Sequence, residues 1–425
     1  MTEEKAAPAS GSILVVGGGI SGLTAALEAA EVGYEVFLVE QNPFLGGRVA
    51  QLNQYFPKLC PPTCGLEINF RRIKDNPRIK VLTMAHVEKV DGAPGNYDVT
   101  IKLAPRYVNE NCTCCGDCAE ASQTEVDSEF DFGMKKVKGA YLPFEMAFPA
   151  RFVISPQIIG SDDAQRCKEA CKYDAVDLDM EAKTLKFNVG SIVWATGWEP
   201  YDATKIDNLG FGQHPNIITN MMMERLASPS GPTQGKILRP SDDKEPGSVA
   251  FVQCAGSRDE NHLPFCSYIC CMASLKQATY VRERYPEAKI YVFYIDLRTP
   301  GLRYERFYEQ IKKDDNIFLI KGKVAEVSED PTNKNITVVA ENAVTGEKIH
   351  QTVEMVVLAT GMQPTTAASK LPADLTYNDD GFIVNDFETG GMFAAGCANK
   401  PADVVSSNQN ATGMALKAIQ TLVNR

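Results

Sequence analysis

The sequence predicts an α/β protein built on two nucleotide-binding-type domains, and three patterns in its 425 residues lead to this expectation. A glycine-rich turn follows an apolar strand near the start of the chain, and a second strand–turn–helix–strand unit begins near residue 247. Two further apolar strands end in the same Ala-Thr-Gly triplet. Strands that alternate with helices are typical of parallel sheets covered by helices.

The first unit matches the fingerprint of a dinucleotide site. Residues 12–16 predict a buried parallel strand, residues 17–22 match G-x-G-x-x-G, residues 23–32 predict a helix, and residues 35–39 predict a second strand that ends at Glu40. The strand before the glycines, the helix after them and an acidic residue about 20 positions on are the context that this motif requires.

Each part of this fingerprint has a physical role. Gly17 permits the tight turn, Gly19 lets the backbone approach a pyrophosphate, and Gly22 lets the helix pack closely on the strand. The N-terminal end of the helix then faces the phosphate charge, and Glu40 is placed to accept hydrogen bonds from ribose hydroxyls.

The residues after this unit favour FAD over NAD. Gly46-Gly47-Arg48, the two strands at 192–197 and 356–361 that end in Ala-Thr-Gly, and the strand at 391–396 together resemble the two-dinucleotide-binding flavoproteins such as thioredoxin and glutathione reductases. That resemblance implies that a helix at about 405–423 closes over the flavin. Cys397 stands where those proteins carry Asp. The expected cofactor-binding residues are Gly17, Gly19, Ile20, Ser21, Gly22, Glu40, Gln41, Gly47, Arg48, Val87, Ala195, Thr196, Gly197, Gly396 and Cys397.

The second nucleotide-binding-type domain lacks its phosphate loop. Residues 247–253, 269–285 and 289–296 predict its strand, helix and second strand, yet no G-x-G-x-x-G follows the first strand. Four thiols occupy this region instead. They suit an iron–sulfur cluster better than zinc, because adjacent cysteines serve one tetrahedral zinc poorly; buried structural cysteines are the alternative. We therefore expect a 4Fe–4S cluster, and no NAD(P), at Cys254, Cys266, Cys270 and Cys271.

A broken ferredoxin pattern lies in the middle of the chain. Cys112, Cys115 and Cys118 begin a C-x2-C-x2-C-x3-C run whose fourth position is Ser122, and Cys171 ends a second run. In two-cluster ferredoxins the fourth cysteine of each run ligates the other cluster. One complete ligand set therefore survives at Cys112, Cys115, Cys118 and Cys171, whereas the second set would need Ser161, Ala164, Cys167 and Ser122 and is mostly without thiols. The insert either holds one cluster or has lost its metal.

Cys60 and Cys64 form a further pair, separated by Pro61, Pro62 and Thr63. A redox-active dithiol and a stiff structural turn are both compatible with this spacing, since thiol reactivity depends on surroundings that a sequence does not reveal.

Composition excludes several classes. Lys and Arg number 43 against 54 Asp and Glu, a net charge of −11, which argues against a nucleic-acid or anionic-membrane binder. No apolar run is long enough for a transmembrane helix. Met1–Lys5 lacks a basic region followed by an apolar core, so no signal peptide and a cytoplasmic location are expected. The 13 cysteines are then more typical of metal or redox groups than of disulfides.

Three segments of this sequence resemble the A subunit of heterodisulfide reductase and its relatives. They are residues 46–52, the broken ferredoxin after residues 105–108, and the cysteine loop from Cys254 to Cys271. The short length, the eroded insert and the tail at 396–403 most resemble the branch of this family found in the quinone-interacting membrane-bound oxidoreductase complex of sulfate-reducing organisms.

This resemblance implies an FAD-bearing electron-transfer subunit on the cytoplasmic side of the membrane. Its partners would be a second flavin–iron–sulfur subunit, together with a membrane haem b/iron–sulfur subunit. The complex would link the menaquinone pool to adenylylsulfate reductase. The family also places a lysine near the flavin ring, which matches Lys276. A cation there would stabilise reduced, anionic flavin.

These patterns give the following domain division. Residues 1–104 are expected to begin the FAD-binding domain, 105–180 to form the degenerate ferredoxin-like insert, 181–244 to continue the FAD-binding domain and lead into a linker, 245–364 to form the second nucleotide-binding-type domain with the cysteine loop, and 365–425 to complete the FAD-binding domain.

Other functions remain open at this point. A free-standing NAD(P)H-dependent disulfide reductase would need the missing second fingerprint. A component of a related sulfur-oxidation complex would carry the same cofactors with different partners, and a scaffold with purely structural FAD would not be reduced at accessible potentials.

Overall fold

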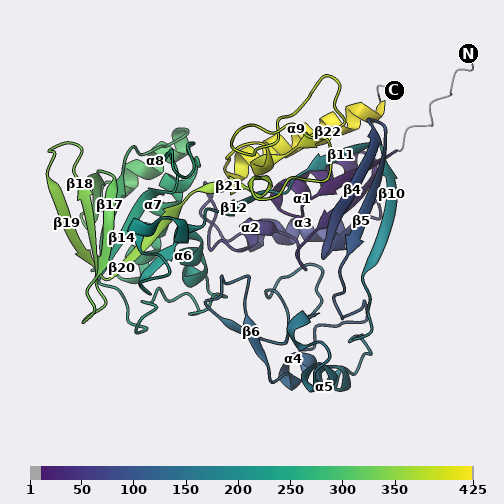
Figure 1. Ribbon diagram of the computed structural model, residues 1–425, viewed down its shortest axis with the longest axis horizontal. Coiled ribbons are helices and arrows are strands. Elements are labelled where there is room, and N and C mark those ends of the chain that lie inside the picture. Colours follow the sequence, from purple (N-terminus) through teal and green to yellow (C-terminus); the bar gives the residue numbers. More distant parts are fainter. Residues whose placement is uncertain (1–10, 424–425) are drawn as a thin grey trace, which may run out of the picture.

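A computed structural model describes residues 11–423 and shows two α/β domains side by side, with a small insert projecting from the first (Figure 1). Met1–Lys5, on which the expected lack of a signal peptide rests, lie outside these residues. Within residues 11–423, no helix combines the length and the apolar character needed to cross a membrane.

The first domain is centred on a five-stranded parallel sheet of order β22-β11-β1-β2-β3. Its strands are β1 (Ser12–Val16), β2 (Glu35–Glu40), β3 (Ile79–Thr83), β11 (Ser191–Trp194) and β22 (Met392–Ala394). The helices of this domain are α1 (Ile20–Glu31), α2 (Gly47–Ala50), α3 (Thr63–Asp75) and α9 (Val404–Val423). The helix expected at 23–32 therefore begins earlier, because Ile20 already belongs to its first turn.

Alternation along β1 assigns the two faces of this sheet. Ile13 and Val15 pack with α1, α3 and α9, whereas Leu14 and Val16 pack with an antiparallel sheet of order β10-β5-β4. Successive side chains of a strand point to opposite faces, so a strand covered on both sides is apolar throughout. The covering strands are β4 (Ala85–Ala93), β5 (Asn96–Leu103) and β10 (Lys183–Val189).

The second domain repeats this plan with the parallel order β13-β20-β14-β15-β16. Its strands are β13 (Ile217–Thr219), β14 (Ser248–Ala255), β15 (Lys289–Tyr294), β16 (Ile317–Lys321) and β20 (Met355–Thr360). One face packs on α6 (Asn220–Ala227), α7 (Cys270–Arg284) and α8 (Leu302–Ile311). The other face packs on the antiparallel sheet of β17 (Val324–Glu329), β18 (Ile336–Glu341) and β19 (Lys348–Val353).

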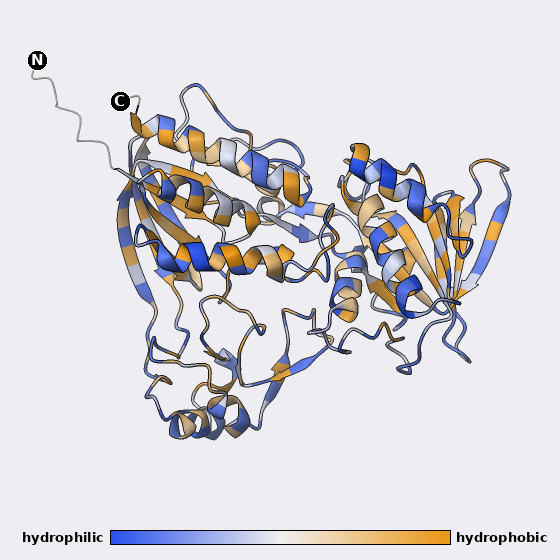
Figure 2. Ribbon diagram, turned by 180° about the vertical axis from the view of Figure 1, so that it is seen from behind, coloured by the Kyte–Doolittle hydropathy of each residue, from blue (hydrophilic) through white to orange (hydrophobic). Residues whose placement is uncertain are grey.

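Hydropathy follows this layering. In Figure 2 the parallel strands are mostly hydrophobic along their length, whereas the helices that cover them carry hydrophilic residues between the hydrophobic ones. This pattern is expected when helices bury one face against a sheet and expose the other.

Two short strands join the domains. β12 (Trp198–Pro200) follows β11, β21 (Met362–Pro364) follows β20, and the two pair antiparallel with Glu199 opposite Gln363. Each strand leaves the carboxyl end of a parallel sheet, which is where ligands bind in open α/β sheets.

The insert lies below the first domain in Figure 1 and contains only small elements. These are β6 (Glu125–Asp127), β7 (Lys136–Lys138), β8 (Ala140–Tyr141), β9 (Val153–Ile154), α4 (Asp117–Ala121) and α5 (Asp162–Ala170). Buried Arg106 anchors the insert to the first domain: its guanidinium donates to the carbonyl oxygens of Phe152 (3.0 Å) and Pro43 (2.7 Å).

Replacing Gly22 by alanine is expected to destabilise the first domain, because a Cβ atom there would lie 1.7 Å from the Gly17 carbonyl oxygen. A matched control is Gly413→Ala in α9, where a Cβ atom meets nothing within 4 Å. We expect that control to stabilise by about 0.5–1 kcal/mol, the usual gain from replacing helical glycine. Thermal unfolding of both variants checks this. A Gly22→Ala protein as stable as the parent would contradict the close packing described here.

Candidate functional site

A cavity of about 960 Å³ runs along the carboxyl end of the first sheet and reaches the second domain. This volume lies at the upper end of the range for small-molecule and cofactor sites. All the residues expected to bind the cofactor line it except Gly22 and Gly396. Ile269 and Met272, which flank the adjacent cysteines of the second domain, line its far wall.

The glycine-rich turn forms one wall of this cavity through its backbone. Added Cβ atoms at Gly17 and Gly22 would lie 2.2 Å from the Ala195 carbonyl oxygen and 1.7 Å from the Gly17 carbonyl oxygen, so both positions require glycine. A Cβ atom at Gly19 would meet nothing nearer than the Gly47 Cα atom, at 3.9 Å. Gly19 therefore has open space on its cavity side, as close approach of a pyrophosphate demands.

Glu40 ends β2 beside this turn and is buried. Its carboxylate accepts hydrogen bonds from the Gly18 backbone N–H (2.6 Å) and from the backbone and side-chain N–H groups of Asn42 (both 2.7 Å). Burial raises the pKa of Glu40 above its ordinary value, although these N–H donors act in the opposite direction. In this arrangement Glu40 holds the turn together as well as facing the cavity.

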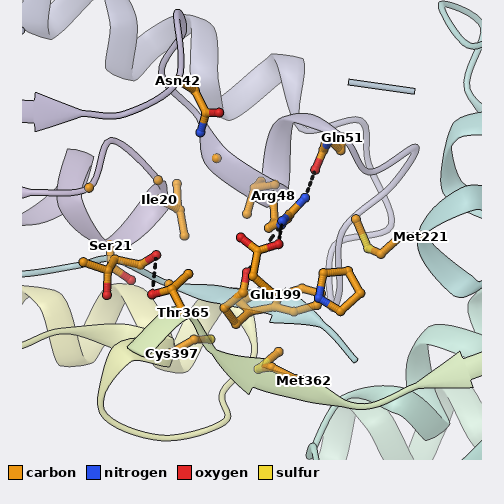
Figure 3. A pocket seen from close by; sticks show the side chains of 18 of the residues that line it. Ile20, Ser21, Asn42, Arg48, Gln51, Glu199, Met221, Met362, Thr365 and Cys397 are labelled. Atoms are coloured by element: carbon orange, nitrogen blue, oxygen red, sulfur yellow. Dashed lines mark hydrogen bonds and ion pairs between the residues drawn. The ribbon is translucent and has the colours of Figure 1, made fainter. Parts of the chain in front are cut away.

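Arg48, in α2, points across the cavity toward the linker strand β12 (Figure 3). Its guanidinium pairs with Glu199 and donates to the Gln51 side-chain oxygen (3.1 Å) and the Trp198 carbonyl oxygen (3.4 Å). Burial lowers the pKa of Arg48, while the charge of Glu40 acts against that shift. A cation held at the cavity wall suits the diphosphate of a dinucleotide.

Gly396 and Cys397 lie at the other side of the turn. Gly396 has φ +61°, a Cβ atom there would lie 2.1 Å from the Ser21 Oγ atom, and its backbone N–H donates to the Asn410 side-chain oxygen of α9 (2.7 Å). Cys397 lines the cavity, and burial raises the pKa of its thiol to about 11. The thiol is thus uncharged at neutral pH, in contrast to the carboxylate that the flavoprotein resemblance leads one to expect at this position.

The residues present fit FAD on two counts. The turn leaves its Gly19 face open, and the Thr196 Oγ1 atom, in a residue that lines the cavity, is buried without a hydrogen-bond partner. A buried polar atom without a protein partner is uncommon and marks a position where a ligand or water completes the hydrogen bonding.

Lys276, expected near the flavin ring, lines the cavity from α7 and is buried. Its ammonium lies 2.9 Å from a carboxylate oxygen of Glu224, whose side chain is 1% exposed, and it also donates to the Gln54 carbonyl oxygen. Glu224 further accepts from Gln277 (2.6 Å) and Tyr280 (3.1 Å). The positive charge of Lys276 is therefore neutralised and held in place by a network that the sequence pattern did not reveal.

The four cysteines of the second domain come together around the start of α7. Cys254 ends β14, Cys266 lies in the following loop, and Cys270 and Cys271 open α7. Burial, then the charges of the other three thiols, hold the pKa of Cys270 well above its ordinary value. All four thiols are free. A set of four free thiols has the donor chemistry of an iron–sulfur cluster.

The turn after β14 differs from a phosphate-binding turn in its packing. A Cβ atom at Gly256 would lie 2.5 Å from the Tyr201 ring. Tyr201 also hydrogen-bonds to the Nδ1 atom of His262 (2.9 Å). An aromatic ring therefore packs directly against this turn.

Four of the six cysteines in the insert, Cys112, Cys115, Cys118 and Cys171, line one small cavity of about 20 Å³ together with apolar side chains. Burial, then the charges of Cys167, Cys112, Cys171 and Cys115, raise the pKa of Cys118 to about 12. The structure thereby brings Cys112, Cys115 and Cys118 to Cys171, which lies far from them in the sequence.

At the positions of the second ferredoxin set, hydrogen bonds take the place of cluster ligands. The buried carboxylate of Asp163 accepts from the Ser122 hydroxyl (2.8 Å), the backbone N–H groups of Gln123 (2.8 Å) and Thr124 (3.0 Å), and the Arg166 guanidinium (2.8 Å). Ser161 caps α5 by accepting from the Ala164 N–H. Hydrogen bonds therefore hold together a region that lacks the thiols for a cluster.

Within residues 11–423, no group of three or more His, Cys, Asp or Glu side chains is arranged to hold a metal ion. The cysteine sets stay candidate cluster ligands on the chemistry of their four thiols.

Comparison with known proteins finds relatives over most of the chain. A family model described as FAD dependent oxidoreductase matches residues 12–60. One of two iron–sulfur A subunits of CoB–CoM heterodisulfide reductase from Methanopyrus kandleri is 40% identical over 96% of this chain and 64% of its own length. Over almost its whole length, the chain is thus similar to the A subunits of heterodisulfide reductases. The A subunit of the H2:CoB–CoM heterodisulfide,ferredoxin reductase of Methanothermobacter marburgensis is 36% identical, with the same coverage of 96% and 64%.

This chain thus spans just under two thirds of the length of these relatives. The family match names FAD, and the iron–sulfur naming of the Methanopyrus relative fits the two cysteine sets found here.

Solved structures confirm the fold expected from the flavoprotein resemblance. The thioredoxin reductase of Lactococcus lactis superimposes with a TM-score of 0.54 at 13% identity, covering 97% of this chain and 99% of that one. The T. acidophilum thioredoxin reductase gives 0.53 at 14% identity, with 97% of each chain covered. At these identities the likeness concerns the fold alone.

Sequence reasoning missed Glu199 and Glu224. A signal for Glu199 exists, because both Ala-Thr-Gly triplets continue to a proline, as Trp198-Glu199-Pro200 and Met362-Gln363-Pro364, and these segments pair as β12 and β21. The repeat thus identifies the two segments that connect the domains, and both of them line the cavity. No comparable signal exists for Glu224, whose partners come from distant segments.

Asp163→Asn is expected to destabilise the insert at neutral pH. Burial would raise the pKa of Asp163, but hydrogen bonds from Gln123, Thr124 and Ser122 outweigh it and lower that pKa well below its ordinary value. A depressed folded-state pKa gives stability that is present above the unfolded value, near pH 4, and lost as pH falls through the folded value. The difference in unfolding midpoint between parent and variant should shrink below about pH 4.

Asp179→Asn is the matched control, since that side chain is 91% exposed. It should leave the unfolding midpoint of the insert nearly unchanged. An Asp163→Asn protein that unfolds like this control at pH 7 would contradict the stabilising role of the Asp163 network.

Proposed function

We propose that this chain is an electron-transfer flavoprotein subunit that holds FAD in the large cavity and iron–sulfur clusters at its two cysteine sets. FAD would supply the ability to exchange electrons one or two at a time. The observation that carries this proposal is the position of Ile269 and Met272, which line the FAD cavity and flank Cys270 and Cys271. A cluster on those thiols would sit close behind the cavity wall.

The second domain supports electron entry by contact with a protein rather than as hydride from NAD(P)H. Its first turn has no glycine fingerprint, and the Tyr201 ring packs against Gly256 in that turn. Mixing the FAD-loaded protein with NADH or NADPH should therefore leave the flavin absorbance unchanged. Rapid bleaching by either nucleotide would favour a free-standing NAD(P)H-dependent reductase.

The biological setting that we propose follows the branch of the family that this sequence resembles. In it the chain works on the cytoplasmic side of the membrane with a second flavin–iron–sulfur subunit, together with a membrane haem b/iron–sulfur subunit. The complex would link the menaquinone pool to adenylylsulfate reductase in sulfate reduction. The support is the eroded insert and the segment at 396–403. Co-purification from a native sulfate-reducing source tests these partners. Capture of sulfur-oxidation subunits instead would overturn this setting in favour of the related sulfur-oxidation complex.

Iron and acid-labile sulfide per FAD test the cluster sites on anaerobically purified protein. Because each cubane needs four thiolates, we expect about eight irons per FAD if both cysteine sets are loaded and about four if only one is. Cys270→Ser and Cys115→Ser should each remove about four irons from a fully loaded protein. Cys114→Ser, outside both proposed sets, is the control and should keep the full content. FAD without any iron would refute the cluster assignment.

Lys276→Met is expected to lower the midpoint potential of the bound flavin, because it leaves the buried Glu224 carboxylate beside the cavity without its cation and so disfavours added negative charge. Lys312→Met, which removes an exposed lysine from the end of α8, is the charge-matched control. Redox titration of both variants provides the measurement. An unchanged potential in Lys276→Met would remove the tuning role of Lys276.

A further inference from the structure

Residues 53–62 reach from the first domain to the second and contact the wall of the FAD cavity. The Asn53 N–H donates to Glu224 (3.0 Å), and the Gln54 carbonyl oxygen accepts from Lys276. Phe56 lines the cavity and stacks on Tyr304 of α8, with ring centroids 5.3 Å apart and planes 15° apart. This segment therefore holds the charged pair of the cavity from one side.

The same segment leads into Cys60 and Cys64, two thiols that no part of the proposed cluster chemistry uses. Cys60 is half-buried, Cys64 is exposed, and both are free. The Cys64 N–H donates to the Pro61 carbonyl oxygen (3.4 Å), so the residues between the thiols already form the turn that begins α3. Cys60 forms a β-bridge with Tyr55 directly before this turn, so only three residues separate the two thiols at the start of α3.

Tyr55 places both sulfur atoms beside one hydroxyl. Its backbone N–H donates to the Cys60 carbonyl oxygen (3.2 Å). Burial, then the hydrogen bond to the Cys60 sulfur and the charges of Cys60 and Cys64, raise the pKa of Tyr55 to about 12. The Tyr55 hydroxyl thus stays protonated at neutral pH beside the Cys60 sulfur.

We propose that Cys60 and Cys64 form a thiol–disulfide exchange site that takes disulfides from solution. The exposed Cys64 thiolate attacks one sulfur of an external disulfide, forms a mixed disulfide and releases the first thiolate. The Cys60 thiolate then attacks the Cys64 sulfur, which forms the Cys60–Cys64 bond and releases the second thiolate. The external disulfide gains the two electrons that the pair loses, and an external dithiol reverses both steps.

The oxidation state of this pair bears on the FAD cavity through residues 53–62. A Cys60–Cys64 bond would constrain the turn whose Cys60 carbonyl accepts from Tyr55, and Tyr55 directly follows the Gln54 carbonyl that accepts a hydrogen bond from Lys276. This link rests on the proposed function, whereas the exchange chemistry does not depend on bound FAD.

The exchange is tested on the full-length protein equilibrated anaerobically with oxidised and reduced dithiothreitol, followed by alkylation and peptide mass spectrometry. We expect a reversible Cys60–Cys64 disulfide, lighter by about 2 Da than the dithiol. With oxidised glutathione, Cys60→Ser should trap a mixed disulfide on Cys64, because the resolving thiol is absent. Cys64→Ser should trap far less, and Cys114→Ser is the control that should behave like the parent.

Absence of the Cys60–Cys64 bond across the accessible dithiothreitol range, or equal trapping in Cys60→Ser and Cys64→Ser, would overturn the proposal. Exchange with glutathione but not with an oxidised protein such as thioredoxin would assign it to small disulfides, and the converse to protein disulfides. Iron and FAD are measured on the same samples, so failure of cofactor loading is recognised separately from failure of exchange.

The link to the cavity is read from the flavin midpoint potential of parent protein in its disulfide and dithiol forms. We expect the two forms to differ and the Cys60→Ser/Cys64→Ser double variant to show one value under both conditions. Identical potentials in the two parent forms would refute the link.

Discussion

The close approach of backbone to backbone at Gly17, Gly22 and Ala195 is the constraint on which the site depends. With no side chains at the two glycines, α1 starts directly against the ends of β1 and β11. This contact aims the N-terminal end of α1 at the cavity and leaves the Gly19 face free. Interiors are packed closely enough that even one methyl group would have to push these elements apart. The position of every other cavity residue is then set relative to this turn.

The second domain uses the same topology for a different purpose. Its β14–α7 unit corresponds to β1–α1, but the turn between them packs against Tyr201 and carries thiols in place of open glycines. The location is unchanged: the carboxyl end of a parallel sheet, facing the other domain. Free thiols thus stand at the end of this sheet that corresponds to the glycine-rich turn of the first domain. That position also explains why the residues flanking the thiols reach the FAD cavity.

Charge inside the interface between the domains is almost fully compensated. Lys276 pairs with Glu224, Arg225 pairs with Asp131 at 2.8 Å, and each of these side chains is at most 6% exposed. Breaking one partner of such a pair leaves an uncompensated buried charge, which costs far more than the pair contributes. These pairs therefore fix how the two domains fit together. Residues 53–62 contact the Lys276–Glu224 pair beside the cavity through Asn53 and Gln54.

Local patterns in the sequence were sufficient for the architecture. Apolar strands, the glycine fingerprint and the repeated Ala-Thr-Gly triplets depend on neighbours within a few residues, so periodicity and turn chemistry identify them. Thirteen cysteines at ferredoxin-like and paired spacings likewise pointed to sulfur-based chemistry. The Arg48–Glu199 and Lys276–Glu224 pairs and the hydrogen bond between Asp163 and Ser122 were decided by tertiary structure alone. Each of these interactions joins segments that are far apart in the sequence. Their distance in space depends on how whole domains pack, and the spacing of residues along the chain does not reveal it.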